Sequence, residues 1–263
     1  MPNFLIIGAA KSGTTSLYEY LKQHPQIWMS SVKETNFFAL EGELLKFCGP
    51  GEQNYINKFS ITKIEDYLKL FQGVENKIAI GEASPLYLYH PMASRRIQHY
   101  IPDAKLIVIL RNPVDRAYSS FLHLVRDGRE PLRNFTQALR NEKVRICSNW
   151  EHIWHYQQMG FYYLQLHRYF NIFSKQQIRV YLFEDFITNP VYLLKDIFQF
   201  LGVDDSFIPN LSIKHNVSIN SKDQKHTKLM LKIPVRRRLV EVYKEDVFKL
   251  QELIQQELSK WLE

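Results

Sequence analysis

The sequence has few of the residues on which small disulfide-bonded or zinc-binding domains depend. Cys48 and Cys147 are its only cysteines, and they lie far apart and outside any C-x-x-C spacing. Two such cysteines predict neither a disulfide framework nor a zinc site, so we expect free thiols. The fold must therefore be stabilised by a hydrophobic core.

Long hydrophobic runs are also lacking. The first apolar run, Phe4–Ile7, is far shorter than the ~20 residues of a membrane-spanning helix, and no basic stretch precedes it. We therefore expect no membrane-spanning segment and a cytoplasmic location. The chain has 263 residues, 45% of them hydrophobic, without repeats or low-complexity stretches. This length predicts a single domain over residues 1–263.

The charge of the chain is moderately positive. Lys and Arg number 34 against 27 Asp and Glu, a formal net charge of +7. This excess suits an anionic ligand but does not choose among phosphate, sulfate, nucleic acid and lipid. The densest basic run, Arg236–Arg238, begins an amphipathic segment and is interpreted as its solvated face. We expect no nucleic-acid partner.

Short apolar runs bounded by turn residues alternate with longer segments of helical periodicity. This alternation predicts an α/β fold, with a central parallel sheet flanked by helices in three layers. The polar stretch Lys214–Lys228 is predicted to be an exposed loop. The predicted strands are Phe4–Ile7, Lys77–Ile80, Leu106–Leu110 and Ile178–Phe183. The predicted helices include Thr15–Gln23, Glu65–Gln72, Pro113–Val125, Phe161–Phe173 and Val191–Leu201.

A small-residue loop follows the first predicted strand and leads into a helix. Such a loop directs backbone N–H groups and the helix dipole at an anion. Gly8 and Gly13 fit the Walker A pattern of nucleotide triphosphatases, but Thr14 stands where that pattern has lysine, and Lys11 lies inside the loop. The loop therefore suits a shorter phosphate chain. The residues predicted to contact phosphate are Lys11, Ser12, Gly13, Thr14, Thr15 and Ser16.

A second predicted phosphate site follows the strand Leu106–Leu110. Arg111 stands at its carboxyl end, Asn112 is a predicted helix N-cap, and Ser119 follows on the helix. The planar guanidinium of arginine matches a phosphate dianion. Because a cation replaces the acid that would help to hold Mg²⁺ in a triphosphatase, we expect phosphate binding without a metal.

Both segments resemble the sulfotransferase family that uses 3′-phosphoadenosine-5′-phosphosulfate (PAPS), which has a P-loop-like fold. Residues 11–17 are similar to its 5′-phosphosulfate loop, and residues 111–119 to its 3′-phosphate segment. The resemblance implies that Lys11 to Ser16 hold the phosphosulfate and that Arg111 and Ser119 hold the 3′-phosphate. It also implies transfer of the sulfuryl group from PAPS to a hydroxyl or amine acceptor. Residues 81–85, 160–185 and 258–261 support it more loosely.

Sulfuryl transfer requires neutralisation of the leaving phosphate and removal of a proton from the acceptor. Lys11 is suited to the first task. For the second, Lys33 and Glu34 lie in a segment similar to the Lys-Glu-x-x-Phe-Phe motif that supplies the base in glycosaminoglycan-type sulfotransferases. Glu34 is then the predicted base and Lys33 balances its charge, while His123 and His90 are rival bases. The same similarity favours a carbohydrate acceptor.

Other interpretations remain open at this point. Gly8 and Gly13 also occur in P-loop kinases and triphosphatases, and the positive charge also suits a noncatalytic anion-binding module. Residues 214–228 resemble a family segment that closes over the nucleotide. An aromatic-rich stretch is a second candidate for acceptor contact, although such stripes more often belong to a core. Its residues are Trp150, Trp154, His155, Tyr156, Phe161 and Tyr162.

Overall fold

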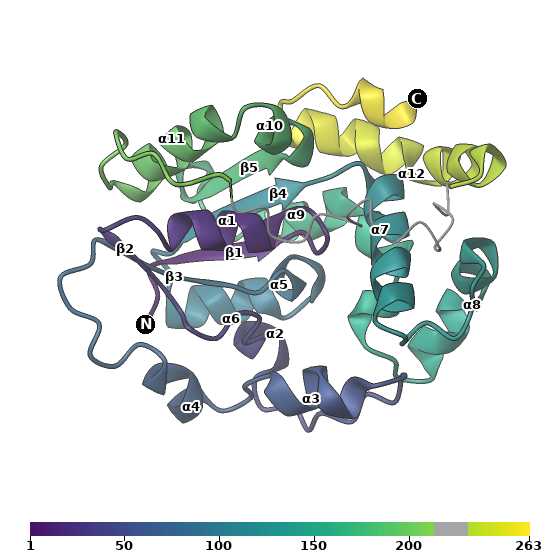
Figure 1. Ribbon diagram of the computed structural model, residues 1–263, viewed down its shortest axis with the longest axis horizontal. Helices are drawn as coiled ribbons and strands as arrows, with labels where there is room; N and C mark the ends of the chain where they lie inside the picture. The colour runs from purple at the N-terminus through teal and green to yellow at the C-terminus, as the bar shows by residue number, and fades with distance from the viewer. Residues whose placement is uncertain (213–230) are drawn as a thin grey trace.

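A parallel five-stranded sheet forms the centre of the structure, a computed structural model that describes residues 1–212 and 231–263 (Figure 1). Its strand order is β2-β3-β1-β4-β5. The predicted α/β fold is thus confirmed, whereas the predicted loop Lys214–Lys228 lies outside the described residues. The strands are β1 (Phe4–Gly8), β2 (Ile27–Met29), β3 (Ala79–Ala83), β4 (Lys105–Leu110) and β5 (Ile178–Leu182).

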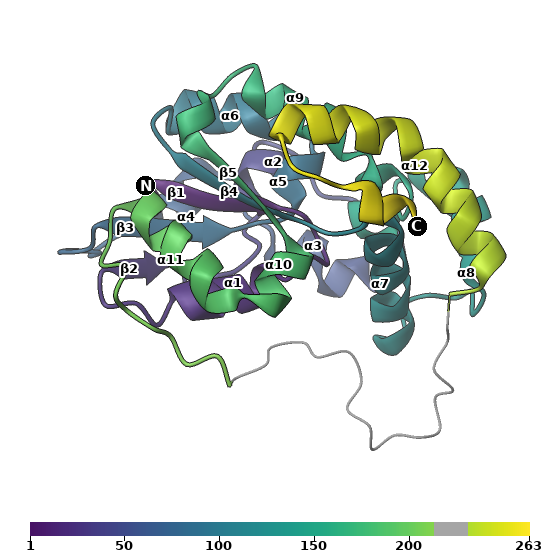
Figure 2. The same cartoon turned by 90° about the horizontal axis from the view of Figure 1, so that it is seen from above.

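Helices cover both faces of the sheet, as the view in Figure 2 shows. Within the described ranges no helix is long and apolar enough to cross a membrane. One face carries α1 (Thr14–Leu21), α10 (Phe183–Thr188) and α11 (Pro190–Leu201). The other packs against α2 (Phe37–Leu40), α3 (Ile56–Phe59), α4 (Ile64–Lys69), α5 (Leu86–Tyr89), α6 (Ala93–Tyr100), α7 (Pro113–Arg126), α8 (Phe135–Cys147), α9 (Tyr162–Phe170) and α12 (Ile233–Ile254).

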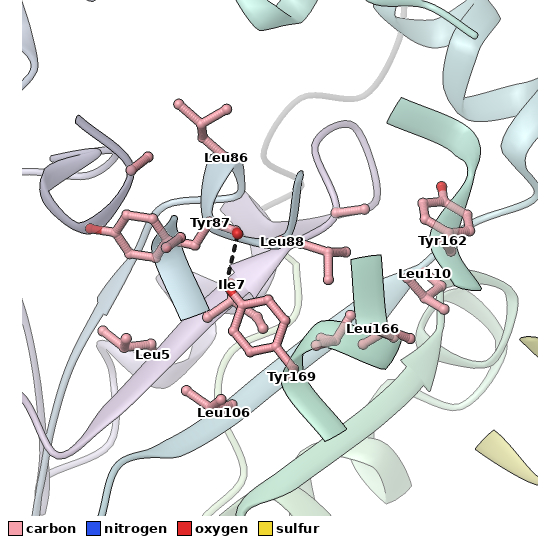
Figure 3. Close-up of a cluster of buried hydrophobic side chains, with 14 of the residues drawn as sticks. Leu5, Ile7, Leu86, Tyr87, Leu88, Leu106, Leu110, Tyr162, Leu166 and Tyr169 are labelled. Atoms are coloured by element: carbon pink, nitrogen blue, oxygen red, sulfur yellow. Dashed lines mark hydrogen bonds between the residues drawn. The ribbon is translucent and has the colours of Figure 1, made fainter. Parts of the chain in front are cut away.

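The central strands β1 and β4 are apolar apart from Lys105 at the start of β4, as is typical of strands buried on both faces. Successive side chains of a strand point to opposite faces, so Leu5 and Ile7 contribute to one core while Phe4 and Ile6 contribute to the other. Figure 3 shows the first of these cores, where leucines of β1 and β4 pack against α5 and α9. A hydrogen bond of 2.7 Å from the Tyr169 hydroxyl to the Tyr87 carbonyl, both buried, links the two helices.

The strand β3 differs from its prediction in a way that matters for function. The prediction ended at Ile80, whereas the observed strand runs on to Ala83 and includes Gly81 and Glu82. Glycine and glutamate seldom favour a strand, but here Gly81 lies directly against the Phe4 ring and leaves no room for a β-carbon. Glu82 is fully buried in the strand and has side-chain partners there. The short strand β2 was not predicted.

Candidate functional site

Three loops lie at the carboxyl edge of the sheet. Two follow β1 and β4, and the third follows β2 and is joined to the end of β3 by a hydrogen bond from the Glu34 N–H to the Ala83 carbonyl. The strand order reverses at β1, which pairs with β3 on one side and with β4 on the other. Open parallel sheets bind ligands at such a reversal of strand order. In Figure 1 the arrowheads of β1 and β4 point toward α7, so the predicted phosphate residues of both strands lie at one edge.

The loop after β1 has the backbone of a compact anion-binding turn. Lys11 has a φ of 66° and Gly13 a φ of 88°, both in the left-handed region. At Gly13 a β-carbon would also approach the rings of Phe183 and Phe186 to 3.1–3.2 Å. Ser12 is fully buried, and its hydroxyl lacks a hydrogen-bond partner among the described residues. A buried hydroxyl without a partner is costly, so this loop fits a polar ligand.

Lys11 is the charged centre of this loop. Partial burial, together with the nearby cations Arg126 and Lys33, lowers the pKa of Lys11 to about 8, although Glu34 and Asp127 act in the opposite direction. A cation held partly out of water attracts a phosphate or sulfate anion more strongly, because water screens the two charges less. Glu34 and the end of α7, with Arg126 and Asp127, thus lie near enough to this loop to act on the Lys11 charge.

Arg111 is attached to the loop after β1. Its Nη1 donates a hydrogen bond of 3.1 Å to the Lys11 carbonyl, and its guanidinium lies 4.7 Å from the centre of the Phe183 ring. Burial lowers the pKa of Arg111, and the carboxylates of Asp115 and Glu184 oppose this effect from nearby. Neither forms an ion pair with Arg111 within residues 1–212 and 231–263. Arg111 therefore retains donors for an anionic ligand. Ser119 lies half-buried on the helix that follows.

The start of α7 is confirmed as the sequence predicted it. Asn112 is the N-cap, and its side-chain oxygen accepts hydrogen bonds from the backbone N–H groups of Val114, at 2.9 Å, and Asp115, at 3.4 Å. Pro113 occupies the first turn, where its missing N–H costs nothing. This cap fixes the direction in which α7 leaves the sheet, and so the position of Ser119.

Glu34 lies close enough to Lys11 for each charge to shift the pKa of the other. Its carboxylate pairs with the Lys33 ammonium and remains 55% exposed. Partial burial alone would raise the pKa of Glu34, but the charges of Lys33, Lys11 and His123 outweigh it, and the net effect lowers this pKa. The carboxylate is thus ionised over a wide pH range and open to an incoming acceptor.

His123 is less suited to act as the base. Its Nδ1 accepts a hydrogen bond of 2.7 Å from Arg126, and its Nε2 lies 3.5 Å from the Asp127 carboxylate. Burial and the nearby Lys11 charge lower the pKa of His123 to about 4. Both ring nitrogens therefore already have partners, and the histidine holds a proton weakly.

His90 lies in a different environment. Its ring contacts that of His152 at 5.6 Å between centres, and burial with the charges of Arg96 and Arg168 lowers its pKa to about 4. None of these neighbours belongs to the loop after β1 or to the Glu34 turn. The geometry thus favours Glu34 over both rival bases.

Most of the aromatic stretch that was a candidate for acceptor contact belongs to the core. Trp154, Tyr156 and Tyr162 are fully buried. Trp154 donates its indole N–H to Glu52 at 2.8 Å, and Tyr162 donates its hydroxyl to the Arg111 carbonyl at 3.1 Å. These three rings are core residues, so the prediction that they stack on the acceptor is wrong.

Sequence reasoning overlooked the polar surroundings of the site. Arg126 and Asp127 at the end of α7 lie close enough to Lys11 to shift its pKa, and Glu82 is buried next to the Glu34 turn. The sequence signal for Glu82 was its place in residues 81–85, which resemble the family without assigning this glutamate a role. Across the described residues no cluster of three or more His, Cys, Asp or Glu could hold a metal ion.

Comparison with known proteins identifies the family. A model of the sulfotransferase family matches residues 2–207, and the chain therefore belongs to this family. A crystal structure of a sulfotransferase from Alicyclobacillus acidocaldarius superposes with a TM-score of 0.89 and 39% identity, covering 100% of this chain and 99% of that one. The resemblance seen in the sequence is thereby confirmed.

Curated relatives are similar over part of their length. Carbohydrate sulfotransferase 15 of Mus musculus is 28% identical over 77% of this chain and 44% of the relative. The bifunctional heparan sulfate N-deacetylase/N-sulfotransferase 2 of Bos taurus is also 28% identical, over 77% of this chain and 22% of the relative. The chain thus spans less than half the length of these relatives.

Proposed function

We propose that the protein transfers the sulfuryl group of PAPS to a hydroxyl or amine acceptor, and that this acceptor is a carbohydrate or glycoconjugate. The observation that carries the proposal is that Lys11, after β1, and Arg111, after β4, lie near Glu34, whose turn after β2 is hydrogen-bonded to the end of β3. Two cations suit a doubly phosphorylated donor, and the carboxylate suits an acceptor proton. The carbohydrate class rests on the names of the similar enzymes.

The donor fits the groups present at this edge. The partnerless Ser12 hydroxyl and the N–H groups at the start of α1 suit the 5′-phosphosulfate, together with Lys11, Gly13, Thr14, Thr15 and Ser16. Arg111 and Ser119 suit the 3′-phosphate. These assignments need no metal, because cations and backbone N–H groups supply the positive charge.

The reaction follows from the roles of three side chains. The acceptor oxygen or nitrogen forms a bond to sulfur while the bond from sulfur to the bridging phosphate oxygen breaks, so the sulfuryl group moves in line. Glu34 takes the proton from the acceptor. Lys11 stabilises the negative charge that the leaving phosphate gains. Lys33 holds the Glu34 carboxylate in its ionised form through their ion pair.

A screen of acceptors tests this proposal. The protein is incubated with PAPS and with glycan, lipid and small-alcohol acceptors in the presence of a chelator, and products are sought by the mass of one added sulfuryl group. We expect sulfated glycan. Exclusive sulfation of a non-carbohydrate would refute the acceptor class, whereas ATP-dependent phosphorylation without sulfation would refute the sulfotransferase activity itself.

Substitution of the base tests the mechanism. Glu34→Gln is expected to lower kcat by about 100-fold or more, in the range of general-base catalysis, while affinity for the desulfated nucleotide changes less than about threefold. Glu252→Gln, an exposed glutamate on α12, is the control. Full turnover by Glu34→Gln would exclude Glu34 as the base. His123→Gln would then be measured next.

A further inference from the structure

The turn that carries Glu34 has an unusual backbone. Glu34 has a φ of 60° and Asn36 a φ of 54°, so two non-glycine residues within three positions adopt the left-handed conformation. This conformation is unfavourable for L-residues and persists only where neighbouring structure holds it. The base is therefore presented by a turn whose shape depends on outside contacts.

Those contacts come from the end of β3. The Glu34 N–H donates a hydrogen bond of 2.9 Å to the Ala83 carbonyl, and the Asn36 N–H donates one of 3.1 Å to the Ser84 hydroxyl. Both left-handed residues are thus attached to consecutive residues after Glu82. The attachment determines where the Glu34 carboxylate stands relative to β1 and its loop, because β1 pairs with β3.

The Glu82 carboxylate joins the side-chain contacts of this turn. Its Oε2 accepts hydrogen bonds from the hydroxyls of Thr35, at 3.2 Å, and Ser84, at 3.0 Å. The Thr35 hydroxyl also lies 3.1 Å from the Tyr87 hydroxyl, which can donate to it. One carboxylate oxygen thereby orients the residue between Glu34 and Asn36 and also the serine that receives the Asn36 N–H.

Glu82 occupies a position where a carboxyl group destabilises the folded protein. It is fully buried, and burial raises its pKa to about 7, although hydrogen bonds from Tyr87, Ser84 and Thr35 and the charge of Lys33 oppose the rise. The buried Tyr67 lies close enough for Glu82 to contribute to the raised pKa of that phenol. Among the described residues neither the Tyr67 hydroxyl nor Oε1 of Glu82 has a hydrogen-bond partner. An apolar residue at this position would make the strand more stable, because burying a carboxyl group costs free energy. The presence of a glutamate here therefore suggests a functional role.

We propose that Glu82 is a positioning residue for Glu34, holding the 34–36 turn in its left-handed form through Thr35 and Ser84. This inference rests on the proposed function, in which Glu34 takes the acceptor proton. Because the task requires only a well-placed acceptor oxygen, a glutamine can fulfil it. The amide oxygen would receive both hydroxyls, and the amide N–H₂ would face the Tyr67 hydroxyl.

Kinetics of three variants test the inference. Glu82→Leu and Thr35→Val remove opposite ends of the same hydrogen bond at nearly constant volume, and each is expected to lower kcat by about 10-fold to 100-fold, the cost of a misplaced catalytic group. The KM for PAPS should change less than about twofold. Glu82→Gln should retain kcat within about threefold, and the Glu82→Leu/Thr35→Val double variant should be no slower than the slower single variant.

A buried carboxylate elsewhere provides the matched control. Glu142 on α8 is also buried and accepts hydrogen bonds of 2.8 Å from the N–H groups of Gln157 and Gln158. Glu142→Gln and Glu142→Leu are expected to change stability but to leave kcat per folded molecule within about twofold. Equal loss of kcat in the Glu142 and Glu82 variants would reduce Glu82 to a structural residue and overturn the inference.

Amide hydrogen exchange gives a readout that does not depend on activity. In Glu82→Leu the N–H groups of Glu34 and Asn36 should exchange at least tenfold faster, while amides of β1 keep their protection. Unchanged protection would contradict the inference, as would full kcat in Glu82→Leu. If the wild-type protein itself fails to sulfate any acceptor, or Glu34→Gln stays fully active, the proposed function fails instead, and the exchange result still reports on the turn.

Discussion

The burial of Glu82 predicts a pH dependence of stability that can be isolated with Glu82→Gln. Burial raises the pKa of this carboxyl from 4.5 to about 7 in the folded protein. As the pH rises through this window, the unfolded chain releases the proton while the folded chain keeps it. The free energy of unfolding contributed by this group therefore falls between pH 4.5 and 7 and is constant above.

The magnitude follows from the size of the shift. A rise of the pKa from 4.5 to about 7, at about 1.4 kcal/mol per pH unit, amounts to about 3 to 4 kcal/mol in total. Glutamine cannot ionise, so Glu82→Gln avoids this loss. The free energy of unfolding of the variant, minus that of the wild type, should therefore increase by about 3 kcal/mol from pH 4.5 to pH 8. This increase does not depend on the difference at pH 4.5.

Urea unfolding at half-unit steps of pH measures this difference, because contributions from all other titrating groups cancel between the two proteins. The control is Glu252→Gln on the exposed surface of α12, which shows how much of the slope comes from replacing any glutamate by glutamine. A flat curve for Glu82→Gln, or one with the opposite slope, would show that Glu82 is not a buried acid of raised pKa. The reasoning about its cost would then be refuted.

Three further outcomes are expected. Since the pKa of Lys11 is about 8, kcat/KM for PAPS should fall about tenfold per pH unit above pH 8, and Lys11→Arg should move this fall upward by at least one unit. Arg111→Met should weaken binding of the desulfated nucleotide about tenfold or more in calorimetric titration, and should weaken binding of adenosine 5′-phosphosulfate less, because that ligand lacks the 3′-phosphate and loses only the support that Arg111 gives to the Lys11 carbonyl. Asn112→Ala removes the cap of α7 and should lower the free energy of unfolding by about 1 kcal/mol in urea.

Parts of the site could be predicted because they depend on local sequence. The Gly8–Gly13 loop and the Asn112-Pro113 helix start are short-range features, and each follows an apolar strand that pattern alone identifies. Strand and helix boundaries near them were correct to within about two residues. The failures occurred where a residue's environment comes from distant segments. Glu82 is the example, since a glutamate in a strand is favoured only by the partners it finds there.

The sequence by itself determined the α/β class, the two segments predicted to bind phosphate and the candidates for the base. It could not choose among Glu34, His123 and His90, because the partners of their side chains lie elsewhere along the chain. Only the tertiary structure brought the Glu34 turn beside Lys11 and engaged both ring nitrogens of His123. The physical reason is that hydrogen bonding and desolvation depend on distances between groups, and the pairing of β1 with β3 and β4 decides those distances.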